Sequence, residues 1–359
     1  MPEAELRSAV PPMKASSGFL AACRSQPVDC TPVWLMRQAG RALPEYRALR
    51  DRFSFLQLCK NPELAAEATL QPVRALKVDA AILFFDILLP LEALGLRLDF
   101  TPAPVLEAPV RTAQAVADLR TPRVARDLPF LAQSVRMAKE ALGQTPLIGF
   151  CGAPLTLACY LVEGGGSADF SHALRMMREE PALWNALLDK LTDLAIDTLA
   201  VQAAAGAQAL QIFDTWAQLL DPEDYFAYVL PHTRRLVEAV RGSVPVLFFL
   251  RGGAPFWLRE CGADVISVDE SVTLAQARKT SGGKAVQGNL APGLLKRPLA
   301  ELEGHVRRVL TENEGALGHI FNLGHGVPPD TPVENLRFVV ESVHRLSAGC
   351  TVSGQEDRE

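Results

Sequence analysis

The 359-residue sequence lacks features that would place it in several common protein classes. No stretch holds the roughly 18 consecutive apolar residues expected of a membrane-spanning helix. Residues 1–17 mix charged side chains with two adjacent prolines and lack the apolar core of a signal peptide. The formal net charge is −5, whereas nucleic-acid-binding proteins usually carry a broad basic face. These absences predict a cytoplasmic protein that binds neither a membrane nor nucleic acid.

Metal and nucleotide motifs are also missing. The seven cysteines are scattered singly without a C-x-x-C pair, so neither a disulfide framework nor structural zinc is expected. No His/Cys cluster has metal-ligand spacing, and there is no nucleophile elbow. Neither G-x-G-x-x-G nor G-x-x-x-x-G-K-[ST] follows the first predicted strand. The sequence therefore predicts no metal site and no cofactor, and the missing glycine motifs argue against a doubly wound sheet.

Short apolar runs alternate with longer helix-like segments along the chain. The runs are rich in Val, Ile, Leu and Phe and mostly do not alternate with polar residues, as expected for strands buried on both faces. Eight such strands predict an α/β fold, a single (β/α)8 barrel over residues 18–346, flanked by flexible tails at 1–17 and 347–359. A doubly wound open sheet is the alternative. The predicted strands are 33–36, 80–85, 146–150, 207–213, 244–250, 264–268, 285–287 and 319–323.

Helix boundaries are marked by local signals. Residues 61–63 and 221–223 each supply a capping side chain, a first-turn proline and an acidic residue. A wide apolar stripe predicts a long helix over 181–205. The stretch between Asp86 and Gly143 is too long for one connection and contains the proline-rich segment 101–104. We therefore expect an extension of the barrel after the second strand.

Seven of the eight predicted strands end at a polar or ionisable residue. This matters because the active site of a parallel barrel lies at the carboxyl ends of its strands. The residues at these ends are Arg37 with Arg41, Asp86, Asp214 with Thr215, Arg251, Asp269, Asn289 and His325.

Arg37 and Arg41 have two interpretations. Four residues apart, they would share one face of a helix, salt-bridged to Glu45. Gly40 between them and Pro44 after them favour a loop instead. In a loop directly after a buried strand, both guanidiniums would face the barrel mouth, where each can bind a carboxylate in bidentate fashion. We favour the loop.

The other candidate residues also have structural alternatives. Asp86 is embedded in the apolar run 84–89, where a carboxylate needs partners to stay ionised, but it could instead cap a helix. His325 lies between two glycines, which let backbone approach a ligand, although a lone histidine often only packs in a loop. Tyr160 would ordinarily be a core aromatic residue. The glycine run 164–166 favours a flexible loop leading into a helix over a phosphate cradle.

Four segments, in order, resemble the signatures of the uroporphyrinogen decarboxylase family. The first is the most specific: PVWLMRQAGR at 32–41, continuing to residue 47. GFCGAPLTL at 149–157 resembles the second, together with Tyr160 and the glycine run. QGNL at 287–290 and NLGHGV at 322–327 match the late motifs. The similarity extends from about Phe19 to Leu346.

This resemblance implies a lyase of haem and other tetrapyrrole biosynthesis. The family is built on a single (β/α)8 barrel that works as a cytoplasmic homodimer without metal or cofactor. Its members convert the four acetate side chains of uroporphyrinogen III stepwise to methyls, giving coproporphyrinogen III and CO2. The resemblance therefore predicts uroporphyrinogen as the small-molecule substrate.

The resemblance also assigns roles to individual residues. Arg37 and Arg41 match the arginines that bind substrate carboxylates, and Arg37 is also implied as proton donor. Asp86 matches the aspartate that faces the pyrrole N–H groups, and Thr215 stands where many members carry serine. Asp86, Arg37 and Tyr160 are thus the predicted catalytic residues. The predicted substrate-binding residues are Arg37, Gln38, Ala39, Gly40, Arg41, Asp86, Tyr160, Thr215 and His325.

The sequence departs from the family pattern at several positions. These are Ala42 for tyrosine, Phe85 for serine, Leu155 for an aromatic residue, Ala217-Gln218 for a glycine pair and Ala291 for aspartate. They motivate one alternative function, a catalytically silent tetrapyrrole-binding protein that retains the fold. A second alternative is a zinc-dependent methyltransferase acting on methylated corrinoids. It needs a His/Cys/Cys-type site, whereas the late strand ends carry Arg251, Asp269 and Asn289.

Overall fold

The computed structural model describes residues 18–349 except 101–102, 243, 253–254 and 314. Most of the two predicted tails, residues 1–17 and 350–359, lies outside the described residues. The final helix extends through Ser347, so the tail predicted from residue 347 begins slightly too early. The described residues therefore cover almost all of the range 18–346 over which the barrel is predicted.

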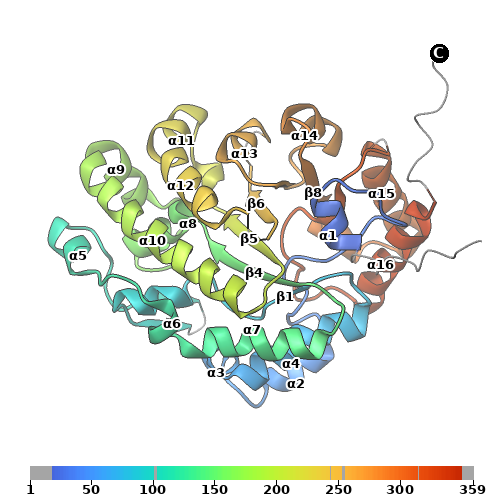
Figure 1. Cartoon of the computed structure of the whole chain (residues 1–359), viewed down its shortest axis with the longest axis horizontal. Coiled ribbons are helices and arrows are strands. Elements are labelled where there is room, and N and C mark those ends of the chain that lie inside the picture. Colours follow the sequence, from blue (N-terminus) through green and yellow to red (C-terminus); the bar gives the residue numbers. More distant parts are fainter. Residues whose placement is uncertain (1–17, 101–102, 243, 253–254, 314, 350–359) are drawn as a thin grey trace, which may run out of the picture.

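A curled, parallel sheet forms the centre of the molecule (Figure 1). Each strand pairs with the next one along the sheet in the order β1-β4-β5-β6-β7-β8-β9. This order never reverses, so the doubly wound alternative is wrong. Seven predicted strands are confirmed, and all their residues are buried, as non-alternating apolar runs require. They are β1 (Ala81–Ile82), β4 (Leu147–Gly152), β5 (Ala209–Asp214), β6 (Val246–Leu250), β7 (Val265–Val268), β8 (Ala285–Leu290) and β9 (His319–Leu323).

The first predicted strand, 33–36, is reduced to a single parallel bridge between Val33 and Phe321 of β9. Phe321 N donates to Pro32 O (2.9 Å), and Trp34 N donates to Phe321 O (3.3 Å). On its other side, Val33 O accepts from Asp79 N (2.8 Å), just before β1. The segment around Val33 therefore links the two edges of the curled sheet.

Helices surround the sheet and cover its outer face (Figure 1). Three predicted boundaries are confirmed: Asn61 and Asp221 cap α4 and α11 by accepting backbone N–H groups, and α10 ends before left-handed Gly206. No helix in the described part of the chain is long and apolar enough to cross a membrane. The helices are α1 (Gly18–Cys23), α2 (Pro44–Arg50), α3 (Phe55–Lys60), α4 (Pro62–Leu76), α5 (Ala113–Asp118), α6 (Val124–Asp127), α7 (Pro129–Leu142), α8 (Pro154–Glu163), α9 (Ser171–Glu179), α10 (Pro181–Ala205), α11 (Pro222–Tyr228), α12 (Leu230–Val240), α13 (Pro255–Cys261), α14 (Leu274–Ser281), α15 (Leu299–Glu312) and α16 (Val333–Ser347), with 3-10 turns η1 (Leu89–Leu94), η2 (Ala217–Leu219) and η3 (Pro292–Lys296).

The extension expected after the second strand contains an antiparallel hairpin, β2 (Leu98–Phe100) and β3 (Pro104–Leu106). It docks on the glycine run after α8, where Val105 bridges to Gly165 and Leu106 N donates to Gly164 O (3.0 Å). A Cβ at Gly165 would lie 2.8 Å from Pro104 O. The glycine run therefore lies in a loop between α8 and α9, as predicted, and the structure adds that Gly164 and Gly165 hold the hairpin.

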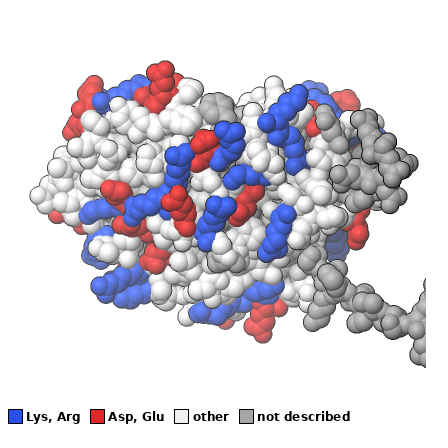
Figure 2. All heavy atoms as spheres, turned by 45° about the horizontal axis from the view of Figure 1, so that its top comes forward, with Lys and Arg blue, Asp and Glu red and all other residues white. Residues whose placement is uncertain are grey.

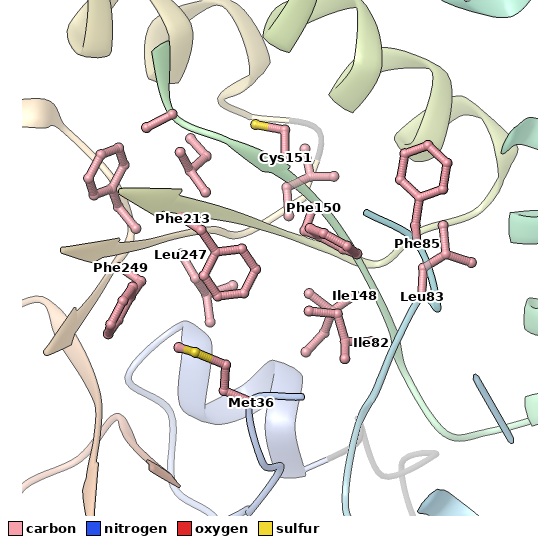
Figure 3. Close-up of a cluster of buried hydrophobic side chains, with 14 of the residues drawn as sticks. Met36, Ile82, Leu83, Phe85, Ile148, Phe150, Cys151, Phe213, Leu247 and Phe249 are labelled. Atoms are coloured by element: carbon pink, nitrogen blue, oxygen red, sulfur yellow. The ribbon is translucent and has the colours of Figure 1, made fainter. Parts of the chain in front are cut away.

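Apolar side chains fill the concave interior of the sheet (Figure 3). Phe150 packs against Phe213 (5.7 Å between ring centroids), and Phe213 packs against Phe249 (6.1 Å). Figure 3 also shows Met36 and Ile82 in this cluster. These rings make a solid floor beneath the carboxyl ends of the strands.

The face turned forward in Figure 2 carries Lys and Arg interspersed with Asp and Glu. Several of the exposed charges form ion pairs between neighbouring helices, such as Arg178–Asp224 (2.6 Å) and Arg234–Glu260 (2.8 Å). This face shows no continuous basic stripe of the kind that binds nucleic acid.

Candidate active site

A cavity of about 530 Å³ opens at the carboxyl ends of the strands. Asp86 follows β1, Thr215 follows β5 and His325 follows β9, while Arg37 follows the segment that links the sheet edges. The barrel topology thus brings together residues that lie far apart in the sequence. The predicted site residues that line this cavity are Arg37, Ala39, Gly40, Arg41, Asp86, Thr215 and His325; Gln38 and Tyr160 do not line it.

The arginine segment forms a tight loop. Arg37 has a φ of +61°, a left-handed conformation that is uncommon outside glycine, and α2 begins only at Pro44. The helix-face interpretation is therefore wrong. Gly40 is closely packed, since a Cβ there would lie 3.0 Å from Arg37 O. The guanidiniums of Arg37 and Arg41 line the cavity, and both residues are exposed and available to a ligand.

The loop around His325 packs directly against Arg37. A Cβ added at Gly326 would lie 2.3 Å from Arg37 Cδ, so only glycine leaves room for the arginine side chain. Val327 N also donates to Met36 O (2.9 Å). The loop that carries His325 and the loop that carries Arg37 therefore form one continuous wall of the cavity.

Asp86 is half-buried, and its Oδ1 accepts a hydrogen bond from Leu88 N (2.8 Å). Burial raises the pKa of its carboxyl to about 6, partly offset by that hydrogen bond and by the charge of Arg37. The N-cap of the following 3-10 turn is Leu88, so Asp86 is not its capping residue. Asp86 therefore supplies a carboxylate to the cavity, ionised at neutral pH but at a cost in solvation.

His325 is also half-buried, with its ring 6.2 Å from the ring of Phe249. Burial, together with the charges of Arg37 and Arg251, lowers the pKa of His325 to about 4, with Asp269 acting in the opposite direction. The imidazole is therefore neutral at physiological pH. One of its ring nitrogens can then accept a hydrogen bond from a ligand.

Tyr160 lies on α8 beside the cavity. Its ring packs against Phe170 (5.8 Å) and Trp216 (6.0 Å). Burial raises the pKa of Tyr160, so its hydroxyl stays protonated at neutral pH. The core-aromatic alternative thus describes its packing, whereas its hydroxyl is close enough to the site for its pKa to respond to Asp86 and Arg37.

Gln38 holds the arginine loop in place. Its Oε1 accepts from Leu35 N (3.0 Å), and its Nε2 donates to Ala80 O (3.1 Å) beside β1. The side chain is buried and faces the backbone. Gln38 therefore stabilises the arginine loop through backbone hydrogen bonds on the side away from the cavity.

The sequence did not indicate the outer wall of the cavity. Phe55 of α3 packs edge-on against Phe84 (5.9 Å) and against Phe100 of the hairpin (4.9 Å), and Tyr46 of α2 contacts Phe84 (5.5 Å). Arg50 lines the same side. Of these residues, Tyr46 fell inside a recognised motif and Phe84 inside a predicted strand, whereas no local pattern marked Arg50, Phe55 or Phe100.

Two of the residues that depart from the family pattern, Ala42 and Phe85, line the cavity. Both are nearly or fully buried, and both make the walls apolar. Among the described residues, no three His, Cys, Asp or Glu side chains are grouped as metal ligands. The cavity thus combines arginines, one carboxylate and aromatic walls, a set that suits a flat ligand bearing several carboxylates.

A family profile and the similar curated proteins name the same family. The profile of the family described as "Uroporphyrinogen decarboxylase (URO-D)" matches residues 14–346. The uroporphyrinogen decarboxylases of Pelobacter propionicus and Trichlorobacter lovleyi are each 54% identical over 334 residues, which cover 92% of this chain and 98% of theirs. That of Geobacter metallireducens is 53% identical with the same coverage.

Two solved structures are similar at low sequence identity. A methyltransferase from Methanosarcina mazei has a TM-score of 0.76 at 18% identity, covering 92% of this chain and 98% of that one. A B12-independent methionine synthase from Shewanella sp. W3-18-1 has a TM-score of 0.56 at 11% identity, covering 82% of this chain and 90% of that one. At these identities, the similarity shows a shared fold alone.

Proposed function

The chain belongs to the uroporphyrinogen decarboxylase family, and on that premise we propose that it converts the four acetate side chains of uroporphyrinogen III stepwise to methyls. The products are coproporphyrinogen III and CO2, on the route to haem and other tetrapyrroles. The observation that carries the proposal is the pairing of Asp86 with Arg37 in one cavity at the strand ends.

Arginines are suited to hold this substrate. Uroporphyrinogen bears eight carboxylates, and a guanidinium can bind a carboxylate through two parallel hydrogen bonds. Arg37 and Arg41 line the cavity and are exposed. We assign both to substrate carboxylates, with His325, Thr215 and the backbone of residues 38–40 completing the contacts.

Asp86 is the residue assigned to the chemical step. Protonating a pyrrole carbon gives a cationic ring, and the C–C bond to the departing carboxylate then breaks with its electron pair flowing into that ring. CO2 leaves, a proton adds to the exocyclic carbon to complete the methyl, and the ring carbon loses its added proton. Each turn thus exchanges one carboxylate for one proton. The substrate serves as its own electron sink, so the residues named need no cofactor.

A fixed carboxylate helps because the positive charge exists only after protonation. At about 4 Å and an effective dielectric near 20, Asp86 would contribute on the order of 4 kcal/mol to the cationic ring. That interaction favours the transition state over the bound substrate. The free-energy cost of desolvating the Asp86 carboxylate is met when the protein folds, so it does not add to the activation barrier of the reaction.

Proton delivery is assigned to Arg37, which shares the cavity with Asp86 and whose charge acts on that carboxyl. An unperturbed guanidinium holds its proton tightly, so the transfer should be the step most sensitive to substitution of Arg37. Tyr160 is assigned to positioning, because it packs on Trp216, next to Thr215, and does not line the cavity.

We also propose a complete (β/α)8 barrel over residues 18–346, with the segment around Val33 as its eighth strand. The hydrogen bonds of this segment to β9 and to the chain entering β1 support the closure. The resemblance to the family supports a cytoplasmic homodimer without metal or prosthetic group. Light scattering coupled to gel filtration tests the dimer: a mass near 39 kDa, that of one chain, would contradict it.

The test of function is an anaerobic assay with uroporphyrinogen III. Products oxidised to porphyrins and separated by number of carboxylates should pass from eight to four. Asp86→Ala should still bind the substrate but lose most turnover, and an exposed control, Asp51→Asn, should match the wild type. Substrate binding without loss of any carboxylate would instead support the catalytically silent alternative.

A further inference from the structure

Arg251 follows β6 and has no role in the function proposed above. The eight chain segments around the barrel mouth run in order from the Val33 segment through β1 and β4–β9. β6 is the fifth of these segments, so Arg251 stands across the mouth from Arg37. The question is whether its side chain reaches the same ligand.

The strand register places Arg251 at the height of the cavity. Leu250 pairs with Asp214 of β5, and Arg251 N donates to Asp214 O (3.3 Å), so Arg251 is level with Thr215, which lines the cavity. Leu247 and Phe249 of β6 point into the interior cluster (Figure 3). Because side chains alternate along a strand, position 251 continues this inward series. The charge of Arg251 also acts on His325, a residue of the cavity wall.

No acidic side chain satisfies this guanidinium in the described structure. Buried Asp269 on the neighbouring strand end is already occupied: its Oδ2 accepts from Gly252 N (2.8 Å), and its Oδ1 accepts from Ser271 N (3.1 Å) and Ser271 Oγ (2.5 Å). Arg251 is half-buried. A partly desolvated guanidinium without a counter-charge is a receptor for an external anion.

We infer that Arg251 is a further substrate-binding residue, which holds a carboxylate of the macrocycle on the side opposite Arg37. The inference rests on the proposed function. Arg251 itself does not line the 530 Å³ cavity, but it lies level with Thr215, which does. A macrocycle that carries carboxylates all around its rim would therefore present one of them on the Arg251 side of the cavity.

The carboxylate held by Arg251 belongs to a propionate. One site must accept the substrate after each acetate is lost, and a contact useful in every step has to hold a group that the reaction retains. Propionates are retained in coproporphyrinogen. Such a contact is equal in the bound substrate and the transition state, so it acts on KM and leaves kcat unchanged.

The test compares Arg251→Met and Arg251→Lys with the wild type, using uroporphyrinogen III and its pentacarboxylate intermediate as substrates. Arg251→Met should raise KM by about 10- to 100-fold for both substrates, as expected for a lost charge-assisted hydrogen bond, with kcat within twofold. Arg251→Lys keeps the charge but loses the planar fork, and should raise KM less. Arg241→Met, at the exposed C-terminal end of α12 and before β6, is the control and should leave both constants unchanged.

Three outcomes would overturn the inference. Unchanged KM in Arg251→Met removes Arg251 from the substrate, and a loss confined to kcat assigns it to another role. A raised KM for uroporphyrinogen alone would mean that Arg251 binds an acetate. A wild-type protein without decarboxylase activity would refute the proposed function itself, which keeps the two failures distinguishable.

Discussion

Replacing Asp86 by asparagine should separate the cost of a buried charge from its use in catalysis. Asparagine has nearly the same shape, and its Oδ1 can still accept the hydrogen bond from Leu88 N. It removes only the negative charge. The substitution should therefore stabilise the fold and, at the same time, abolish most turnover.

The stability gain follows from the pKa of Asp86, raised from 3.8 to about 6. Keeping this carboxylate ionised costs at most about 3 kcal/mol of folding free energy, because solvent still reaches the half-buried group. Since the pKa is raised by folding, the penalty is absent below pH 3.8, grows as the pH rises and is complete above about 6. Asp86→Asn should therefore stabilise the protein fully at pH 8, about half as much at pH 5, and not at all near pH 3.8.

The loss of turnover follows from the charge interaction with the cationic ring. Removing on the order of 4 kcal/mol of transition-state stabilisation corresponds to a fall of roughly 1,000-fold in kcat. Substrate affinity should change little, because the ring is neutral when it binds. The same charge thus opposes folding and favours reaction.

Thermal unfolding at pH 8 and pH 5 measures the first effect, and the anaerobic assay measures the second. With an unfolding entropy of about 2.1 cal/mol/K per residue, a 359-residue chain should gain up to about 4 °C in Tm at pH 8. Asp51→Asn, at an exposed helix end, should change neither quantity. A destabilised Asp86→Asn protein at pH 8 would refute the desolvation argument, and retained turnover would refute the catalytic one.

Further predictions concern titration and packing. The kcat/KM of the wild type should be constant above about pH 6 and fall tenfold per pH unit below it as Asp86 is protonated; a constant value down to pH 4.5 would contradict the need for a carboxylate. Thr156→Val removes the donor 2.7 Å from buried Asp214 Oδ1 and should lower the unfolding free energy by about 1–3 kcal/mol in denaturant titrations, whereas Thr156→Ser should not. The ¹³C NMR signal of His325 should report a neutral ring from pH 5.5 to 8, and Arg37→Met should raise its pKa from about 4 towards the ordinary 6.5. An unmoved titration would exclude the Arg37 charge as a cause.

Much of the fold was predictable because its strands are buried on both faces. Seven of the eight apolar runs form strands of the parallel sheet, and the caps at Asn61 and Asp221 act as their side chains require. The run at 33–36 failed as a regular strand because only Val33 pairs with β9, while Arg37 turns the chain with a left-handed φ. Apolar composition predicts burial of this segment, but regular hydrogen bonding as a strand depends on neighbouring strands that are distant in sequence.

The charged part of the site was predictable for a different reason. Barrel topology gathers the residues after each strand, so Arg37, Asp86 and His325 meet whatever the details of their loops. The direction of a side chain within its loop is not set by that rule. Gln38 turns to the backbone of Leu35 and Ala80, and no spacing in the motif distinguishes this from a contact with substrate.

The hairpin seated on Gly165 has a consequence for how this enzyme class can diversify. Phe100 of the hairpin lines the cavity, yet neither strand of the hairpin is part of the central sheet. The hairpin is instead anchored by Gly164 and Gly165. Its length and side chains can vary over generations while Arg37 and Asp86 stay fixed on the barrel. Natural selection can thus reshape the ligand-facing wall without disturbing the reaction, provided that a glycine persists at position 165.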